Sequence, residues 1–346
     1  MRIGVLNTAF LGDAVLTLPL LQNLKKKFKA AEIDFYVRGG LSPLFENHPA
    51  ISRVFSYDKR EGQKGFTQLA SFARHIQQQH YDVWISPHTS LRSSILAKFS
   101  NAPVRVGYKE AALAKLCYTH IVPRCFKELA EIERILNLLR PLDVQPEEVW
   151  PEIFLPTKDM EKATEFFKVR GKPVLGLHPG STWATKCWPA EYFAEIGARA
   201  VQAGATVVVF AGRGEELVAQ EVINCITSKI GYKLCSERVY NLAGSLSLTE
   251  LACFIGGLDC YVTNDSGPMH IAWASHIPVI AIFGPTITEF GFAPRGKSSV
   301  VHQVELPCRP CSLHGPQVCP LGHHNCMKFV LPDMVWNDVL RFLNFT

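Results

Sequence analysis

The sequence predicts an α/β protein built from two Rossmann-like, doubly wound domains in tandem. Apolar runs of about four to six residues alternate with amphipathic helical stretches, a pattern typical of parallel β-α-β units. The alternation occurs twice, and a segment rich in Pro, Glu and Asp at 141–156 separates the two series. A chain of 346 residues is longer than a single hydrophobic core usually supports, so we expect domains at 1–156 and 157–331. We also expect a C-terminal helix at 332–346 that could cross back to the first domain.

The elements of both domains follow from local pattern. The first domain begins with a buried strand at 2–6 and a helix from about 13 to 28, in which Pro19 could introduce a kink. Its further elements are strand 33–37, helix 41–47, strand 54–57, helix 67–79 and strand 81–86. The elements of the second domain are strand 173–178, helix 190–204, strand 206–211, helix 215–230, strand 239–242, helix 248–255, strand 260–263, helix 268–275 and strand 279–283.

Composition narrows the class of protein. Hydrophobic residues make up 47% and charged residues 19%, so each domain can bury a core. With no signal peptide and no run of 18 apolar residues, we expect a cytoplasmic protein without a transmembrane helix. Residues 1–150 contain 20 Lys and Arg and 14 Asp and Glu, a net charge of +6, whereas 151–346 contain 16 and 17, a net charge of −1. The positive charge of residues 1–150 favours an anionic partner or an anionic membrane surface, and the alternative is that these side chains are simply solvated. The basic residues are not interleaved with aromatic ones, so no nucleic acid partner is expected.

The first motif, residues 8–13, follows the first strand and opens a helix. Gly12 allows a close approach of the backbone, and N–H groups at a helix start favour a negative charge. Asp13 has two interpretations. It caps the helix, or it is a general base that takes the proton of an attacking sugar hydroxyl. The dinucleotide fingerprint G-x-G-x-x-G is absent.

The second motif, residues 178–189, follows the first strand of the second domain. Ser181 and Thr182 offer N–H and O–H groups to a phosphate, and Lys186 offers the positive charge. The alternative for Lys186 is a solvated loop lysine. His178 is interpreted as a hydrogen-bonded residue at the strand end.

The third motif, residues 263–270, joins a strand to a helix whose first turn contains Pro268. Asp265, Ser266 and Gly267 place several donors beside an open helix N-terminus, which suits a diphosphate. His270 either lines that diphosphate or packs beneath the helix.

Two weaker sites follow from topology. The Gly-rich loop at 212–216 could hold ribose hydroxyls through Glu215 or Glu216. The segment Gly284-Pro285-Thr286 ends the last expected strand and would close the site near the diphosphate.

The eleven cysteines are an odd number and lie mostly in apolar stretches, which favours reduced, buried thiols. A late cluster differs, with Cys308, Cys311, Cys319 and Cys326 spaced C-x2-C-x7-C-x6-C among histidines. This spacing is compatible with a structural zinc ion, with two disulfides or free thiols, and less well with an iron–sulfur cluster.

Taken in order, the three motifs and Gly284-Pro285-Thr286 resemble those of the ADP-heptose:lipopolysaccharide heptosyltransferase family, glycosyltransferase family 9, and look most like heptosyltransferase II. The resemblance runs from residue 1 to the final helix. It implies a GT-B fold with two domains facing a central cleft. It also implies an inverting transfer of L-glycero-D-manno-heptose from ADP-heptose to the inner core of lipopolysaccharide, as the second heptose.

The resemblance also implies roles for individual residues. Asp13 is the general base, and Lys186 stabilises the leaving diphosphate. The implied donor site consists of Gly12, Ser181, Thr182, Lys186, Glu215, Glu216, Leu246, Asp265, Ser266, Gly267 and His270. The implied acceptor residues are Lys59, Arg60, Arg92 and Arg134, the last within Glu133-Arg134.

The implied partners are ADP-heptose, a lipid A–core precursor and, transiently, the inner leaflet of the membrane. No cofactor is expected for catalysis, because positive protein groups can replace a divalent metal. Three alternatives stay open. They are a heptosyltransferase I- or III-type acceptor, a GT-B transferase with another nucleotide sugar such as a UDP-sugar, and a nucleotide- or glycan-binding module without turnover.

Overall fold

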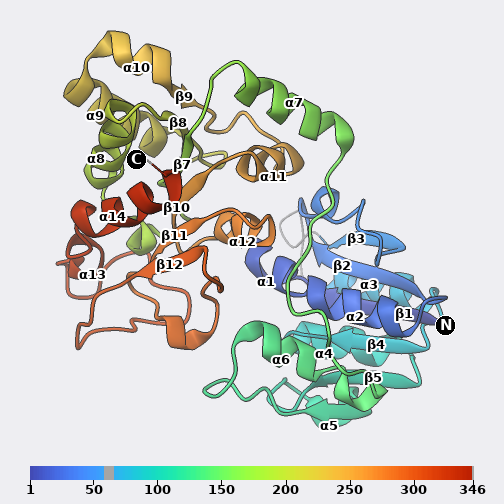
Figure 1. The fold of residues 1–346 in the computed structure, drawn as a ribbon. Coiled ribbons are helices and arrows are strands. Elements are labelled where there is room, and N and C mark those ends of the chain that lie inside the picture. The colour runs from blue at the N-terminus through green and yellow to red at the C-terminus, as the bar shows by residue number, and fades with distance from the viewer. Residues whose placement is uncertain (58–65, 345–346) are drawn as a thin grey trace. The chain divides into compact units, whose positions relative to one another are not determined.

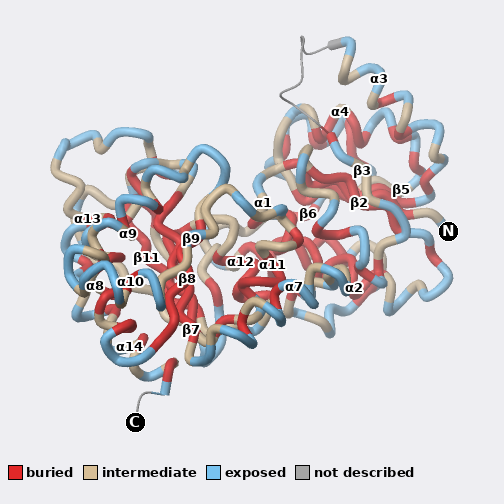
Figure 2. Tube along the Cα trace, turned by 90° about the horizontal axis from the view of Figure 1, so that it is seen from above, coloured by how far each residue is buried: buried red, intermediate tan, exposed pale blue. Residues whose placement is uncertain are grey.

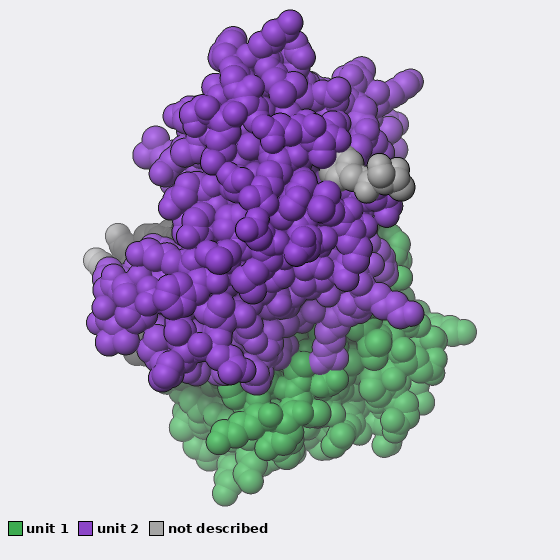
Figure 3. Space-filling model, turned by 60° about the vertical axis from the view of Figure 1, so that its left-hand side comes forward, with its two compact units in different colours: residues 1–154 green, residues 155–346 purple. Residues whose placement is uncertain are grey.

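The computed structural model describes residues 1–57 and 66–344, which form two α/β units (Figure 1). Unit 1 comprises Met1–Phe154 and unit 2 comprises Leu155–Thr346, coloured separately in Figure 3. Each unit has its own parallel sheet, and the expectation of two doubly wound domains in tandem is confirmed.

Unit 1 is built around a parallel sheet with β1 and β4 at its centre. Over the described residues its six strands run in the order β3-β2-β1-β4-β5-β6. The strands are β1 (Arg2–Asn7), β2 (Glu32–Arg38), β3 (Arg53–Tyr57), β4 (Val83–Ser86), β5 (Val104–Tyr108) and β6 (His120–Val122). Two groups of helices pack on the sheet: α1 (Leu11–Leu16), α2 (Leu18–Lys27) and α6 (Glu131–Asn137), and α3 (Phe66–Gln77), α4 (Leu91–Phe99) and α5 (Ala114–Cys117).

Unit 2 repeats this topology, with the strand order β12-β11-β10-β7-β8-β9. The strands are β7 (Val174–His178), β8 (Thr206–Val209), β9 (Val239–Asn241), β10 (Cys260–Asn264), β11 (Val279–Ile282) and β12 (Ser299–His302). One helical layer contains α8 (Ala190–Gln202), α9 (Glu216–Ile230), α10 (Tyr232–Arg238) and α14 (Pro332–Leu343), and the other contains α7 (Thr157–Lys168), α11 (Leu248–Gly256) and α12 (Gly267–Ala274). A short helix, α13 (Asn325–Lys328), precedes α14.

The central strands of both sheets are covered by helices and therefore buried (Figure 2). Every residue of β7 and of β10 is buried, as the apolar runs in the sequence predict for parallel strands. In each sheet the strand order reverses between two central strands, β1 and β4 in unit 1 and β7 and β10 in unit 2. Ligands of open α/β sheets bind at such switch points, at the carboxyl ends of the strands.

Several local expectations need correction. The helix expected at 41–47 is only a single 3₁₀ turn, Ser42–Leu44, because Pro43 supplies no N–H to a longer helix. The helix expected at 13–28 is two helices, α1 and α2, divided at Thr17, and Pro19 lies in the first turn of α2, where an N–H is not needed. The sequence analysis assigned no elements to residues 87–140, which contain β5 and β6, and did not anticipate β12. These three strands are short and only partly buried, so their apolar signal is weak.

The linker and the last helix are tied to their own units. Asn23 of α2 donates to the Glu148 carbonyl at 2.6 Å and accepts from the Glu147 N–H at 2.7 Å, so the linker lies along unit 1 up to the boundary. Helix α14 contacts α8 and the strands β10, β11 and β12, and it belongs to unit 2 rather than forming a third part.

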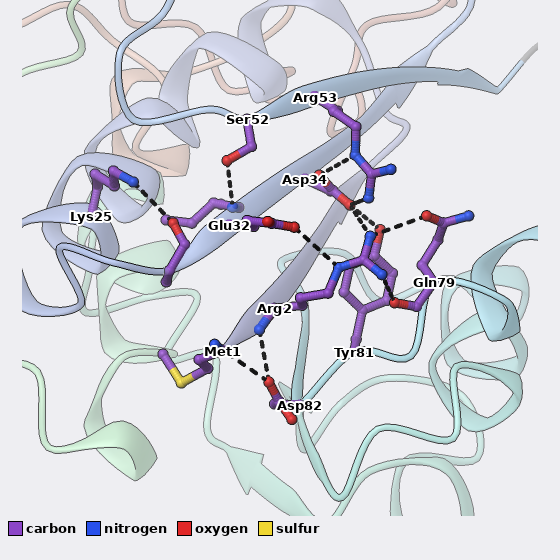
Figure 4. Close-up of polar contacts among 12 residues, drawn as sticks. Met1, Arg2, Lys25, Glu32, Asp34, Ser52, Arg53, Gln79, Tyr81 and Asp82 are labelled. Atoms are coloured by element: carbon purple, nitrogen blue, oxygen red, sulfur yellow. Dashed lines mark hydrogen bonds and ion pairs between the residues drawn. The ribbon is translucent and has the colours of Figure 1, made fainter.

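A buried polar network fastens the amino-terminal ends of the unit 1 strands (Figure 4). The Asp34 carboxylate on β2 is fully buried and accepts two hydrogen bonds from Arg53, at 2.6 and 3.0 Å, and one from the Tyr81 hydroxyl at 2.6 Å. Arg2 lies 3.7 Å from the same carboxylate. A buried carboxylate needs such partners, and here they come from β1, from β3 and from the residues just before β4. This end of the sheet is opposite the carboxyl end of β1, which Asp13 follows.

Among the described residues, no helix combines the length and the apolar character that a membrane crossing requires.

Candidate active site

The loops that follow β7 and β10 meet at the switch point of unit 2, and Asn264 joins them. Its buried carboxamide donates to the carbonyls of Pro179, at 2.8 Å, and Gly180, at 3.3 Å, and accepts from the Trp188 N–H at 3.0 Å. Both ends of the loop 179–188, the phosphate loop, are therefore fixed to the end of β10.

A buried ion pair forms the centre of this site. The Lys186 ammonium lies 2.6 Å from Oδ2 of Asp265, and the Thr286 hydroxyl donates to the same oxygen at 2.7 Å. Lys186 and Asp265 are only 9% and 8% exposed. The pair brings together the second and third sequence motifs, and Thr286, which follows β11, adds the segment Gly284-Pro285-Thr286. An ammonium has three donors, so Lys186 can hold an anion while it stays beside Asp265.

The amino terminus of α12 opens beside this ion pair. Ser266 is the N-cap residue, but its side chain makes no capping hydrogen bond to the helix and instead lies 3.3 Å from the Thr263 hydroxyl. Gly267 and Pro268 begin the helix, and since Pro268 has no N–H, the N–H groups of Gly267 and Met269 are those left without an intrahelical partner. Such groups, together with the helix dipole, favour a phosphate.

His270 follows in the first turn of α12 and is buried. Burial lowers its pKa to about 4, which the Asp265 charge only partly opposes, so the imidazole is neutral at pH 7. Its buried Nδ1 has no hydrogen-bond partner among the described residues. A buried polar nitrogen without a hydrogen-bond partner destabilises the folded state unless a ligand supplies that partner.

The two glutamates after β8 have different environments. Glu215 accepts from the Gly212 N–H at 3.0 Å and lies against Gly180, where an added Cβ would be 2.2 Å from the carboxylate oxygen. Glu216 is exposed and accepts from the Gly214 N–H at 2.8 Å. Glu215 thus lies against the phosphate loop, while the more exposed Glu216 lies against Gly244, where an added Cβ would be 2.5 Å from its carboxylate oxygen.

Other predicted donor residues surround this centre. Ser181 is half-buried and its hydroxyl accepts from the Trp183 N–H at 3.4 Å, whereas Thr182 is exposed. The Thr185 hydroxyl is occupied by the Pro316 carbonyl. Leu246 is half-buried in the loop after β9. His178 bonds the Tyr261 hydroxyl at 2.7 Å, as expected for a residue at a strand end.

In unit 1, Asp13 lies in the loop–helix junction after β1. It is not the N-cap residue, a position held by Phe10, but the third residue of α1, and its Oδ2 accepts from the Phe10 N–H at 3.1 Å. Burial, reinforced by the negative charge of Glu131, raises the pKa of Asp13 from 3.8 to about 6. Arg124 and the Phe10 N–H oppose this rise. A carboxylate with this pKa is ionised at pH 7 yet basic enough to accept a proton.

A second charged group in unit 1 contains residues that the sequence analysis missed. Glu131 accepts from Arg124 at 2.9 and 3.0 Å and from Arg134 at 2.7 Å. Arg134 is fully buried and pairs with Glu131, and its neighbour Glu133 accepts from the Ala130 N–H. Arg134 therefore supports Arg124, the more exposed cation. The i,i+3 spacing of Glu131 and Arg134 on α6 is one that allows an ion pair, but no sequence signal marks Arg124 as their third member.

Of the remaining acceptor candidates, Arg92 lies near the start of α4 with its guanidinium 5.6 Å from the centre of the Tyr57 ring. Lys59 and Arg60 lie outside the described residues.

The four late cysteines lie in a segment, 308–326, that runs along the phosphate loop. None of them forms a disulfide. Over the part of the chain that the structure describes, no group of three or more His, Cys, Asp or Glu side chains could hold a metal ion, so the arrangement does not support the possible zinc site at Cys308, Cys311, Cys319 and Cys326.

Comparison with known proteins identifies the family of this chain. The sequence profile of glycosyltransferase family 9 (heptosyltransferase) matches residues 69–318. Lipooligosaccharide heptosyltransferase 2 of Campylobacter jejuni is 27% identical over 343 residues, 99% of each chain.

Solved structures share the fold over the whole chain. The family 9 glycosyltransferase of Veillonella parvula has a TM-score of 0.86 at 24% identity, covering 100% of this chain and 98% of that one. The ADP-heptose lipopolysaccharide heptosyltransferase II of Escherichia coli has a TM-score of 0.80 at 21% identity, covering 99% of both.

The two parallel sheets match the two-domain GT-B fold of these solved structures. Since the family profile covers most of its length, the chain belongs to glycosyltransferase family 9, the heptosyltransferases.

Proposed function

We propose that this enzyme transfers L-glycero-D-manno-heptose from ADP-heptose to the inner core of lipopolysaccharide, with inversion, and that it adds the second heptose. The observation that carries the proposal is the convergence of Lys186, Asp265 and Thr286 beside the uncapped first turn of α12. The choice of the second heptose follows the relative named heptosyltransferase 2.

The donor diphosphate binds where positive charge and free donors coincide. Lys186 and the first N–H groups of α12, beginning at Gly267, contact the phosphate oxygens, together with hydroxyls of Ser181, Thr182 and Ser266. His270 completes its orphaned Nδ1 with a hydrogen bond to the donor.

The nucleoside of the donor extends toward the loops after β8 and β9. The exposed Glu216 accepts hydrogen bonds from the ribose hydroxyls, and Leu246 packs on the adenine. We assign the ribose to Glu216 rather than Glu215, because Glu216 is exposed whereas Glu215 is half-buried against Gly180.

The reaction is a single displacement. The acceptor hydroxyl attacks the anomeric carbon, and its proton passes to the Asp13 carboxylate as the new C–O bond forms. The bond from the anomeric carbon to the phosphate oxygen breaks, and ADP leaves with its negative charge stabilised by Lys186 and the N-terminus of α12. These groups supply the charge that a divalent metal supplies elsewhere, so we propose catalysis without a metal ion.

The acceptor is an anionic lipid A–core precursor, and unit 1 carries the cations for it. Arg92 and the Arg124–Glu131–Arg134 group are the described candidates, and Lys59 and Arg60 complete the set proposed from the sequence. The excess positive charge of residues 1–150 also suits a transient contact of this cytoplasmic enzyme with the anionic inner leaflet.

A transfer assay tests the proposal. The purified enzyme is given ADP-heptose or a UDP-sugar, with Kdo-lipid A or its monoheptosylated form as acceptor. We expect product only from ADP-heptose and the monoheptosylated acceptor. Transfer to Kdo-lipid A alone would refute the second-heptose assignment, and transfer from a UDP-sugar alone would refute the donor. ADP binding without transfer to either acceptor would favour a binding module.

A further inference from the structure

The cysteine segment, residues 308–326, is held at both ends against the loop after β11. At one end, Arg309 donates to the carbonyls of Phe283, Gly284 and Thr286, the last at 2.6 Å. The Cys311 N–H donates to the Pro285 carbonyl at 2.9 Å. The segment is thereby fixed to the loop that carries Thr286, a partner of Asp265.

The other end is fixed through α13. Met327 packs so closely on Gly284 that a Cβ there would lie 2.2 Å from its sulfur. Just beyond α13, the Val330 carbonyl accepts from the Trp188 indole N–H at 2.8 Å. Met327, Val330 and Trp188 are buried, and with the first end fixed by Arg309 the middle of the segment is held along the phosphate loop.

The middle of the segment bonds directly to the backbone of the phosphate loop. The Gln317 carboxamide accepts from the Ala184 N–H at 3.2 Å and donates to the Thr182 carbonyl at 2.9 Å. His324 Nε2 donates to the Thr185 carbonyl at 2.7 Å. Three peptide groups on the amino-terminal side of Lys186 therefore depend on two side chains that lie more than 130 residues away in the sequence.

Close packing adds to these bonds. Gly315 has a φ of +80°, and a Cβ on it would lie 2.9 Å from Pro285 and 3.5 Å from Cγ of Lys186. Here glycine is required both by its backbone conformation and by the lack of space. The Thr185 hydroxyl donates to the Pro316 carbonyl.

The phosphate loop makes few backbone bonds of its own at this point. Within 182–187 these are the bonds from the N–H groups of Lys186 and Cys187 to the carbonyls of Trp183 and Ala184, at 2.8 and 3.1 Å. Asp265 holds the Lys186 ammonium, but a single 3₁₀ turn fixes little of the backbone that carries the side chain. The contacts from the cysteine segment add a constraint on that backbone.

We propose that Gln317 and His324 are positioning residues for the transfer reaction, which hold the phosphate loop so that Lys186 meets the donor diphosphate. They act through Lys186 and do not touch the substrate. This inference rests on the proposed function, because it assumes that Lys186 binds the donor phosphates. It gives the cysteine segment a role that does not depend on a metal ion.

Steady-state kinetics of Gln317→Ala and His324→Leu test the inference. Loss of hydrogen bonds that order a phosphate-binding loop should raise the KM for ADP-heptose about five- to tenfold, while the acceptor KM stays within about twofold. His324→Gln, which keeps an N–H donor, should recover most of the donor affinity. The matched control is Gln202→Ala, which removes an exposed glutamine at the end of α8 and should leave both KM values unchanged.

A double-mutant cycle separates positioning from general destabilisation. In a Lys186→Met background, Gln317→Ala should raise the dissociation constant for ADP, measured by calorimetry, less than about twofold, because the cation that it positions is gone. A full five- to tenfold effect in that background would overturn the inference, as would an unchanged donor KM in both single variants. If Gln317→Ala does not fold, the His324→Leu and His324→Gln pair decides the question. A wild-type enzyme that neither binds ADP nor transfers heptose would refute the proposed function itself.

Discussion

Replacing Asp13 with asparagine gives a test in which stability and activity should change in opposite directions. Asparagine has nearly the same shape, and its carbonyl oxygen can accept from the Phe10 N–H in place of Oδ2. The substitution removes the negative charge, whose burial, beside the charge of Glu131, raises the pKa of Asp13 from 3.8 to about 6.

The stability change follows from this pKa. A carboxyl group with a raised folded-state pKa favours folding at low pH, and that contribution is lost as the pH rises through about 6. At pH 8 wild-type Asp13 is ionised in both the folded and the unfolded state. Ionisation costs the folded state up to about 3 kcal/mol, since each unit by which the pKa is raised corresponds to about 1.4 kcal/mol. The neutral asparagine side chain avoids that cost, so the variant should be more stable at pH 8, and the gain should vanish below about pH 4.

Two measurements check this reasoning. Urea unfolding of wild type and Asp13→Asn at pH 8 and at pH 4 measures the free energy of unfolding, and the gain should appear only at pH 8. The transfer rate should fall by about 10²–10⁴-fold, and the wild-type acidic limb of kcat/KM near pH 6 should disappear. A variant that keeps more than about a tenth of wild-type activity, or that retains the acidic limb, would refute the general-base assignment.

Three further predictions concern the donor site. Lys186→Met should lower kcat/KM about 10²- to 10³-fold, which steady-state kinetics would measure. It should also destabilise the fold, because Asp265 is left buried without its cation, and thermal melting would detect that loss. Gly180→Ala should change the donor KM by less than about twofold, since its Cβ displaces only the flexible end of the Glu215 side chain, and a rise beyond about fivefold would show that this carboxylate holds the phosphate loop in place. Activity should persist after dialysis against EDTA, and a loss restored by Mg²⁺ would disprove catalysis without a metal ion.

The fold could be predicted from the sequence to the extent that its elements are long and fully buried. Strands such as β7 and β10 are continuous apolar runs, and their loops carry glycine, serine and proline at a strand end and a helix start. The edge strand β12 and the residues between 87 and 140 have weaker signals. There, strand formation depends on pairing with a neighbouring strand, and the local residue pattern does not predict that pairing.

The motifs of the candidate site could be predicted one by one from the sequence, but the contacts between them could not. Lys186 and Asp265 each stood out by residue type and position. Nothing in the sequence distinguished the exposed Glu216 from the half-buried Glu215, or predicted that Arg124 joins Glu131 and Arg134. Those distinctions depend on burial and on partners distant in the chain.

Local sequence is enough to define the fold class and the three loops in which the chemistry of unit 2 lies, because strand ends and helix starts are encoded within a few neighbouring residues. Which groups meet is settled only when the chain is folded. The order of strands places the loops after β7 and β10 side by side, so that Lys186 reaches Asp265 across 79 residues and Gln317 reaches the phosphate loop across more than 130. Such contacts arise from sheet topology, whose pairings join segments that share no local pattern.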